Sequence, residues 1–179
     1  NKDIPVYHKD VDAYEVFDKD GYFHTGDAGY IKNGELFLKD RIKDLFKTSN
    51  GKYIAPQQVE AMLLVDKFID QVAVVADRRK FVSALVVPEF PLLEEFAREH
   101  RIPFETREDL CANQQVYDMI KTRIDTLQQP LASYEQIKRF TLLAHHFSME
   151  SGELTNTLKL KRTVIYKNSN KEIEKMYEE

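Results

Sequence analysis

The chain has 179 residues, which is enough for one domain of ordinary size with a hydrophobic core. Its 30 acidic and 26 basic residues give a formal charge of −4 at pH 7, which argues against a nucleic-acid-binding protein that works by bulk charge. Cys111 is the only cysteine, so an internal disulfide and a cysteine-based zinc cluster are excluded and a reducing compartment is indicated.

The first forty residues are typical of a β-rich segment. A strand is predicted at residues 22–25, after a turn at residues 18–21. A hairpin is predicted at residues 30–38, because Asn33-Gly34 lies between apolar positions and suits a two-residue turn. Two strands alone are marginally stable, so we expect this segment to belong to a larger sheet that is absent from the chain.

A charged stretch, residues 39–44, follows the hairpin, and we expect the domain boundary there, between residues 40 and 41. Pro56 suits the first turn of a helix. Apolar runs and helical spacing then predict strands at residues 45–48, 72–76, 81–87 and 140–144, and helices at residues 56–65, 91–101, 116–127 and 163–179. The expected fold class is α+β.

The first two stretches with candidate binding residues lie near this boundary. The carboxylate of Asp27, after Thr25-Gly26, can accept hydrogen bonds from two sugar hydroxyls, and Gly26 permits a close approach of the backbone to a ligand. Arg41 can bind ribose or phosphate oxygens through its planar fork, and Lys43 in a short linker can act as a pivot. Taken singly, the first stretch is better explained as a surface turn and the second as a solvated charge run.

A third stretch, residues 49–56, contains Gly51-Lys52-Tyr53 and precedes a predicted helix that carries Glu60. A turn centred on glycine before a helix can present N–H groups to an anion or line a narrow channel. The Gly-Lys-Ser/Thr spacing of a phosphate-binding loop is absent, so this is not a Walker-type site. An ordinary β-to-α connection explains the stretch equally well.

The fourth stretch, residues 152–162, has Thr155 and Thr157 before Lys159. Such a loop can carry an ammonium group into a site, where it stabilises the negative charge that develops on a transferring phosphoryl group. Taken alone, the stretch is also typical of a mobile basic loop.

In their order and spacing, the four stretches resemble the adenylate-forming superfamily of acyl-CoA synthetases, luciferases and peptide-synthetase adenylation domains. The shared elements are Thr-Gly-Asp from residue 25, Asp-Arg-x-Lys-Asp from residue 40, Gly-Lys-Tyr-x-x-Pro from residue 51 and Leu-Thr-x-Thr-x-Lys-x-Lys-Arg from residue 154. The sequences of residues 40–47 and 49–56 are most similar to the long-chain fatty acid branch. The resemblance covers the whole chain and is weakest at residues 92–136, where extra helical sequence fits that branch.

The resemblance implies the C-terminal part of a long-chain fatty acid–CoA ligase. Such an enzyme converts a fatty acid and ATP to acyl-AMP and pyrophosphate, and then loads the acyl group onto CoA. Residues 1–40 would be the β-rich end of the large AMP-binding domain, and residues 41–179 the mobile small domain with a helical insertion around residues 91–136. The central part of this domain would be a three-stranded sheet flanked by helices. Mg²⁺ would be held by the large N-terminal domain, which is the expected partner.

The resemblance also implies residue roles. Asp27 would hold the ribose hydroxyls of ATP, Arg41 would assist at the nucleotide, and Lys43 would lie at the hinge. Lys159 would be the catalytic lysine that contacts the reacting carboxylate and the α-phosphate. After a swing of the small domain, the face formed by Gly51, Lys52 and Tyr53 would line the path of the CoA pantetheine.

Four positions differ from the pattern of the wider superfamily. Asn156 stands where many relatives have proline, and Leu158 where glycine often precedes the lysine. Asp40 replaces a common glycine before Arg41, and His24 replaces a frequent basic residue. The residues at 158 and 40 suit the long-chain branch.

Other readings stay open. The enzyme could adenylate another carboxylic acid, since the acyl pocket is expected upstream together with the phosphate loop, and the chain alone is therefore expected to be inactive. A non-catalytic interaction module that retained the fold is a further alternative. Metal-dependent hydrolysis by His145 and His146 is disfavoured, because adjacent histidines point to different faces and no carboxylate completes a ligand set.

The expected location is the cytoplasm, with peripheral attachment at the inner membrane face as an alternative. No apolar run approaches the roughly 20 residues of a membrane span, so no transmembrane segment is predicted. No nucleic-acid partner is expected.

Overall fold

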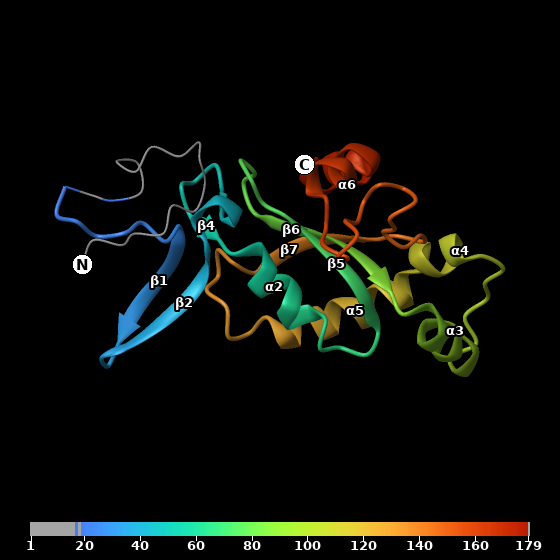
Figure 1. Ribbon diagram of the computed structural model, residues 1–179. Helices are drawn as coiled ribbons and strands as arrows, with labels where there is room; N and C mark the ends of the chain where they lie inside the picture. The colour runs from blue at the N-terminus through green and yellow to red at the C-terminus, as the bar shows by residue number, and fades with distance from the viewer. Residues whose placement is uncertain (1–16, 18, 179) are drawn as a thin grey trace. The chain divides into compact units, whose positions relative to one another are not determined.

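A computed structural model describes residue 17 and residues 19–178, and for residues 39–41 and 43 it describes the backbone alone. The chain divides into two compact units (Figure 1). One ends at residue 44 and is called the hairpin unit below. The other runs from residue 45 to the C-terminus and is called the sheet unit.

The hairpin unit contains strand β1 (Asp27–Lys32) paired with the antiparallel strand β2 (Glu35–Arg41). Asn33 and Gly34 join them with φ values of 54° and 82°, the positive values that a two-residue turn of the primed type requires. The predicted hairpin is therefore confirmed. The pairing contains a bulge next to Ala28, so the register changes by one residue near the open end of the hairpin.

The strand predicted at residues 22–25 is not formed. Phe23 makes only an isolated antiparallel bridge to Phe17, and the two rings lie 5.5 Å apart. Gly21 and Gly26 flank this segment with φ values of 84° and 76°. Positive φ turns the backbone away from an extended path on both sides, so the β-rich composition of the segment does not produce a strand.

Large apolar side chains stay exposed on the hairpin. Ile31 is 75% exposed, and Leu36 and Leu38 are each 66% exposed, while Tyr30 and Phe37 stack on each other with ring centroids 5.2 Å apart. A two-stranded ribbon has no second layer in which to bury these side chains. The described hairpin unit therefore has no core comparable with that of the sheet unit.

The sheet unit is built on three strands in the order β5 (Ile69–Val75), β6 (Val82–Pro88) and β7 (Ile137–Leu142). Strands β5 and β6 correspond to the strands predicted at residues 72–76 and 81–87 and pair antiparallel, and β7 joins β6 in parallel. The strand predicted at residues 140–144 is present but begins and ends earlier. A separate two-stranded ribbon pairs β3 (Phe46–Lys47) with β4 (Tyr53–Ile54).

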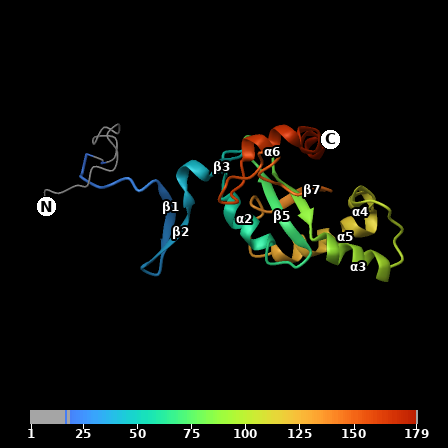
Figure 2. The same ribbon diagram turned by 45° about the vertical axis from the view of Figure 1, so that its right-hand side comes forward.

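Helices cover both faces of this sheet. In Figures 1 and 2, α2 and α5 lie on one side of it, and α6 lies on the other. The core between these layers contains fully buried side chains such as Leu63, Leu85, Ile120 and Ile165. The helices are α2 (Pro56–Leu63), α3 (Phe90–Glu99), α4 (Arg107–Ala112), α5 (Gln114–Leu127), α6 (Arg162–Asn168) and α7 (Asn170–Tyr177). This confirms the α+β class and the helix-flanked three-stranded sheet.

Two helical details differ from the sequence expectation. The single helix predicted at residues 163–179 is two helices, which meet at the buried Ser169. Residues 168–170 are Asn-Ser-Asn, all of low helix propensity, which explains a break at this point. Helix α4 was not predicted. It is stabilised by a capping box in which Asp109 N–H donates to Thr106 Oγ1 at 3.2 Å and Thr106 N–H donates to the Asp109 carboxylate at 2.8 Å.

Among the described residues, no helix is both long enough and apolar enough to cross a bilayer.

Candidate functional site

In the hairpin unit, two predicted site residues lie opposite each other. Asp27 and Arg41 are register partners at the open end of the β1–β2 ribbon. Next to them, Ile42 N–H donates to Gly26 C=O at 2.7 Å, and Asp27 N–H donates to Thr25 Oγ1 at 3.1 Å. Asp27 is exposed, so its carboxylate is accessible to a ligand. Asp27 and Arg41 are fourteen positions apart in the sequence, and the pairing of β1 with β2 places them next to each other.

Lys43, the predicted hinge residue, lies in a short 3₁₀ helix, η1 (Ile42–Asp44), that follows β2 directly. Residue 44 is also the last residue of the hairpin unit. Lys43 therefore lies one residue before the end of the hairpin unit, next to the boundary between the two units.

In the sheet unit, Gly51 and Lys52 belong to a turn of five residues, 48–52, called the Thr48 turn below. Thr48 N–H donates to Lys52 C=O at 2.9 Å, and Lys52 N–H donates back to Thr48 Oγ1 at 3.1 Å. Gly51 N–H donates to Thr48 C=O at 2.9 Å, and Gly51 has a φ of 75°. The turn joins β3 to β4, so Tyr53 follows it as the first residue of β4.

Lys159 lies in a turn of the same length, residues 155–159, called the Thr155 turn below. Thr155 N–H donates to Lys159 C=O at 2.8 Å, and Lys159 N–H donates back to Thr155 Oγ1 at 3.0 Å. Leu158 N–H donates to Thr155 C=O at 2.9 Å, and Leu158 has a φ of 59°. An isolated bridge between Leu154 and Leu160 closes the base of the turn.

The two turns have the same hydrogen-bond pattern, with threonine at the first position, a left-handed residue at the fourth and lysine at the fifth. Glycine occupies the left-handed position in one turn and Leu158 occupies it in the other. A left-handed conformation costs an L-residue about 1–2 kcal/mol and costs glycine almost nothing. Leu158 is therefore held in a backbone conformation that glycine would adopt at lower cost.

The two lysine side chains differ in their surroundings. Lys159 is exposed, and its ammonium group has no hydrogen bond or ion pair with any described residue. The Lys52 ammonium lies 5.5 Å from the ring centroid of Tyr134, and the Lys47 ammonium lies 5.7 Å from that of Tyr53. Among the described residues, the Thr155 turn thus offers an unpaired cation to an anion, whereas the cation of the Thr48 turn, Lys52, lies beside an aromatic ring.

One end of the Thr155 turn is tied to a buried carboxylate that the sequence did not reveal as important. Glu153 is 1% exposed, and its carboxylate accepts hydrogen bonds from the Ser151 hydroxyl at 2.6 Å and from Asn168 Nδ2 at 3.1 Å. Its main-chain carbonyl accepts from Lys161 N–H at 2.7 Å. Among the described residues, the partners of this carboxylate are neutral groups.

At the other end of the turn, Arg162 forms a two-point ion pair with Glu60. Arg162 Nη1 lies 2.6 Å from Glu60 Oε1, and Nη2 lies 2.8 Å from Oε2. Glu60 Oε1 also accepts the N–H of Val74 in β5 at 2.8 Å. Burial lowers the pKa of Arg162, while the hydrogen bonds and the charge of Glu60 raise it, and the net shift is upward. The sequence marked both residues but not their pairing across 102 positions.

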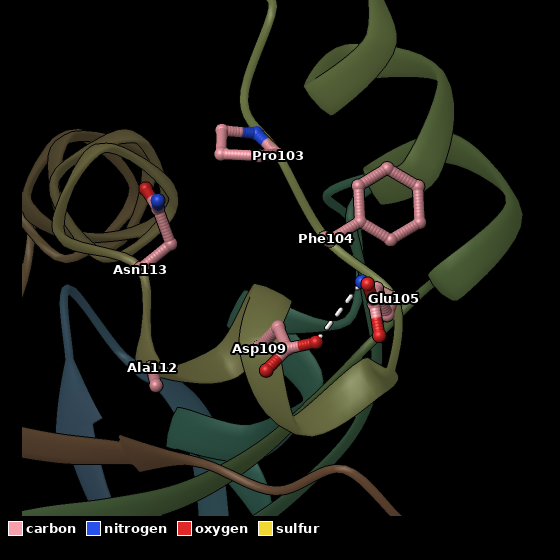
Figure 3. A pocket seen from close by; sticks show the side chains of 6 residues that line it. All are labelled: Pro103, Phe104, Glu105, Asp109, Ala112 and Asn113. Atoms are coloured by element: carbon pink, nitrogen blue, oxygen red, sulfur yellow. Dashed lines mark hydrogen bonds between the residues drawn. The ribbon is translucent and has the colours of Figure 1, made fainter.

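Two surface cavities lie away from the predicted site residues. One, of about 380 Å³, lies at the start of α4 between Phe104, Glu105 and Asn113, and Figure 3 shows Glu105 N–H donating to the Asp109 carboxylate there at 3.0 Å. The other, of about 460 Å³, lies between α5, β7 and α7 and includes Cys111. Burial raises the pKa of the Cys111 thiol to about 11, so this thiol is protonated at neutral pH.

The paired histidines of the sequence do not assemble a metal site. His146 Nε2 lies 3.3 Å from a carboxylate oxygen of Asp70, and the His146 ring meets Phe90 edge to face. Among residue 17 and residues 19–178, no group of three or more His, Cys, Asp or Glu residues could hold a metal ion.

Comparisons with known proteins agree on one family. A family model described as the AMP-binding enzyme C-terminal domain matches residues 43–179. Long-chain-fatty-acid–CoA ligase 5 of Mus musculus is 37% identical over 96% of this chain, and long-chain-fatty-acid–CoA ligase 6 of Homo sapiens is 35% identical over 96%. The chain spans about a quarter of the length of these relatives, 26% and 25% respectively.

Solved structures show the same fold. The adenylation domain of a carboxylate reductase from Mycobacterium chelonae superposes with a TM-score of 0.68 over 91% of this chain and 24% of that one, at 26% identity. The adenylation domain of a carboxylic acid reductase from Segniliparus rugosus, solved with AMP and a co-purified carboxylic acid, gives a TM-score of 0.67 over the same shares at 24% identity.

Proposed function

Because the chain belongs to the family of AMP-binding enzyme C-terminal domains, we propose that it is the C-terminal part of a long-chain fatty acid–CoA ligase. Residues 1–40 form the end of the large AMP-binding domain, and residues 41–179 form the mobile small domain with a helical insertion around residues 91–136. The relatives at 35–37% identity support this substrate class, because their similarity extends over nearly the whole chain.

The proposed reaction has two halves. The carboxylate oxygen of the fatty acid attacks the α-phosphorus of ATP, and pyrophosphate leaves. The thiol sulfur of CoA then attacks the acyl carbon of the adenylate, the thiol proton is released, and AMP leaves.

The observation that carries the proposal is the unpaired ammonium of Lys159 at the end of a rigid turn. Two hydrogen bonds with Thr155 fix the backbone of Lys159, at 2.8 and 3.0 Å, while its side chain is free of partners among the described residues. A cation on such a support can contact the carboxylate and the α-phosphate, where it stabilises the charge that develops as the phosphorus–oxygen bond forms. Lys159 is accordingly the catalytic residue of the first half-reaction.

Asp27 and Arg41 contact the nucleotide in this proposal. A carboxylate can accept both ribose hydroxyls, and a guanidinium group binds ribose or phosphate oxygens. Their opposite positions on the β1–β2 ribbon support a joint role, because one ligand can reach both.

Lys43 serves as the hinge between the two half-reactions. A rotation there removes Lys159 from the site and presents the face of Gly51, Lys52 and Tyr53 to the CoA pantetheine. The position of Lys43 next to the boundary between the two compact units, which follows residue 44, supports this role. Mg²⁺ and the phosphate loop belong to the N-terminal domain, so the 179-residue chain is expected to be inactive alone.

The protein is cytoplasmic, with peripheral attachment to the inner membrane face as the alternative location.

The test is Lys159→Ala in the full-length protein. We expect the rate of acyl-adenylate formation, measured as ATP–pyrophosphate exchange with palmitate, to fall about 10²- to 10³-fold, as for the loss of one group that stabilises transition-state charge. Thioester formation from supplied palmitoyl-AMP should be retained. The matched control is Lys161→Ala, which removes a second exposed lysine two residues away.

Unchanged adenylation in Lys159→Ala would overturn the catalytic role and favour a non-catalytic interaction module. Exchange that depends on an aryl or short-chain acid, and not on palmitate, would overturn the long-chain substrate class alone.

A further inference from the structure

We propose that Glu60 is a positioning residue for the first half-reaction, which holds the Thr155 turn in the orientation that brings Lys159 to the phosphate. This inference rests on the proposed function, and it assigns a role to a residue on helix α2, which is far from Lys159 in the sequence. Glu60 acts through Arg162 and does not itself contact substrate.

The carboxylate of Glu60 is fixed before it meets Arg162. It is 8% exposed, and its Oε1 accepts the N–H of Val74 at the edge of the three-stranded sheet, at 2.8 Å. The carbonyl of the same Val74 accepts the Tyr166 hydroxyl at 2.5 Å. Both main-chain groups of Val74 are therefore satisfied by side chains, and the Glu60 carboxylate has a defined place relative to the sheet.

The bidentate contact transmits this fixed place to the lysine turn. Two parallel hydrogen bonds, at 2.6 and 2.8 Å, set both the position and the rotation of the Arg162 guanidinium group. Arg162 Cζ also lies 5.3 Å from the ring centroid of Phe46, a further contact that restricts the guanidinium group. Arg162 follows Lys159 by three residues and begins helix α6. A displacement of Arg162 therefore moves the end of the Thr155 turn directly.

The pair is better explained by orientation than by stability. A buried ion pair gains little net stability, because the cost of taking both charges out of water offsets most of their attraction. Apolar residues of similar size could join α2 to α6 without that cost, but they would not fix the rotation of a side chain. Misplacement of a catalytic group by about 1 Å can lower a rate by about 10²-fold. A two-point contact between Glu60 and Arg162 would therefore protect the rate by keeping Lys159 in position.

The Thr48 turn has its own attachments and does not depend on Glu60. Ser49 N–H donates to Arg79 C=O at 3.0 Å, and Asn50 Nδ2 donates to Lys80 C=O at 3.4 Å. Both acceptors lie in the connection between β5 and β6. The loss of the Glu60 charge should therefore affect the turn that carries Lys159 and leave the turn that carries Lys52 in place.

The test is Glu60→Gln in the full-length protein. Glutamine keeps the shape and the oxygen that accepts the Val74 N–H, and it loses the charge and one acceptor for the guanidinium fork. We expect kcat for acyl-adenylate formation to fall about tenfold or more, with little change in the KM for ATP. Thioester formation from supplied palmitoyl-AMP should stay within about twofold of the unmodified protein.

Two further variants separate position from stability. Arg162→Lys keeps the charge but not the two-point geometry, and it should lower adenylate formation in the same way. Glu174→Gln is the matched control, because it removes another two-point pair of the same unit, with Arg79 at 3.1 and 2.5 Å, away from the Thr155 turn. It should leave acyl-adenylate formation unchanged.

Equal losses in both half-reactions of Glu60→Gln, together with a lowered Tm, would show a merely structural role and overturn the inference. Full adenylate formation in Glu60→Gln would overturn it as well. If Lys159→Ala abolishes adenylate formation while Glu60→Gln does not, the positioning role alone fails. If Lys159→Ala has no effect, the proposed function fails first.

Discussion

The Thr48 turn and the Thr155 turn have one backbone design and different surroundings. The sequences Thr-Ser-Asn-Gly-Lys and Thr-Asn-Thr-Leu-Lys give the same three hydrogen bonds. Two of them join main-chain groups, and in the third the threonine hydroxyl accepts the lysine N–H. Lys52 lies beside an aromatic ring and Lys159 has no partner among the described residues. The comparison indicates that the backbone sets where a lysine is held, and that the neighbours decide what its charge is free to bind.

Of the variants that test this comparison, those that remove the threonine hydroxyl are expected to have the largest effect on the reaction rates. Thr155→Val keeps the side-chain shape and leaves Lys159 N–H without its acceptor at 3.0 Å. We expect adenylate formation in the full-length protein to fall about tenfold, because the lysine loses its fixed backbone. Thr48→Val should instead lower thioester formation from supplied acyl-adenylate. Identical kinetic defects in the two variants would contradict the division of labour between the turns.

Substitutions at the fourth, left-handed position of each turn test the comparison through the free energy of unfolding. Gly51→Ala should lower the free energy of unfolding by about 1 kcal/mol, because a Cβ at Gly51 would meet no atom within 4 Å and the cost is purely conformational. Leu158→Gly should raise it by up to about 0.5 kcal/mol, since relief of the left-handed backbone is partly offset by the greater freedom of glycine in the unfolded chain. Urea unfolding measures both, and a stabilising Gly51→Ala would be the contrary result.

The third comparison concerns the aromatic neighbour of Lys52. Tyr134→Leu removes the ring that lies 5.5 Å from the ammonium group, and exposed contacts of this kind contribute about 0.5–1 kcal/mol. We expect a small loss of stability and a raised KM for CoA, with adenylate formation unchanged. An effect on ATP–pyrophosphate exchange as large as that on the KM for CoA would remove the distinction between the two lysines.

Local signals explain which parts of the fold the sequence could predict. Asn33-Gly34 predicted the hairpin because a primed turn needs positive φ at both positions, and Pro56 predicted the start of α2 because its missing N–H is harmless there. Helix α4 was missed although its Thr-x-x-Asp cap is visible at residues 106–109, because six residues are too few for a clear apolar period.

The candidate site was predictable only as separate stretches. The order of the four motifs indicated Asp27, Arg41 and Lys159, but the equivalence of the two turns depends on hydroxyl-to-backbone hydrogen bonds that leave no apolar pattern. Glu60 and Arg162 are 102 positions apart, and their pairing depends on how α2 packs against α6. A contact of this kind leaves no local pattern from which a single sequence would predict it. Such long-range contacts are the part that only the folded chain supplies.

The bulge next to Ala28 has a consequence for electrostatics. Between the turn and the bulge, β1 and β2 pair residue by residue, from Lys32 with Glu35 to Gly29 with Leu38. Beyond the bulge the register is shifted by one residue of β2, so Ala28 pairs with Asp40 and Asp27 pairs with Arg41. If the pairing continued through this point without a bulge, Asp27 would stand opposite Asp40, and two acidic positions would face each other where an acidic and a basic position are now paired. The bulge therefore decides which charges face each other at the open end of the ribbon, while the composition of the ribbon is unchanged.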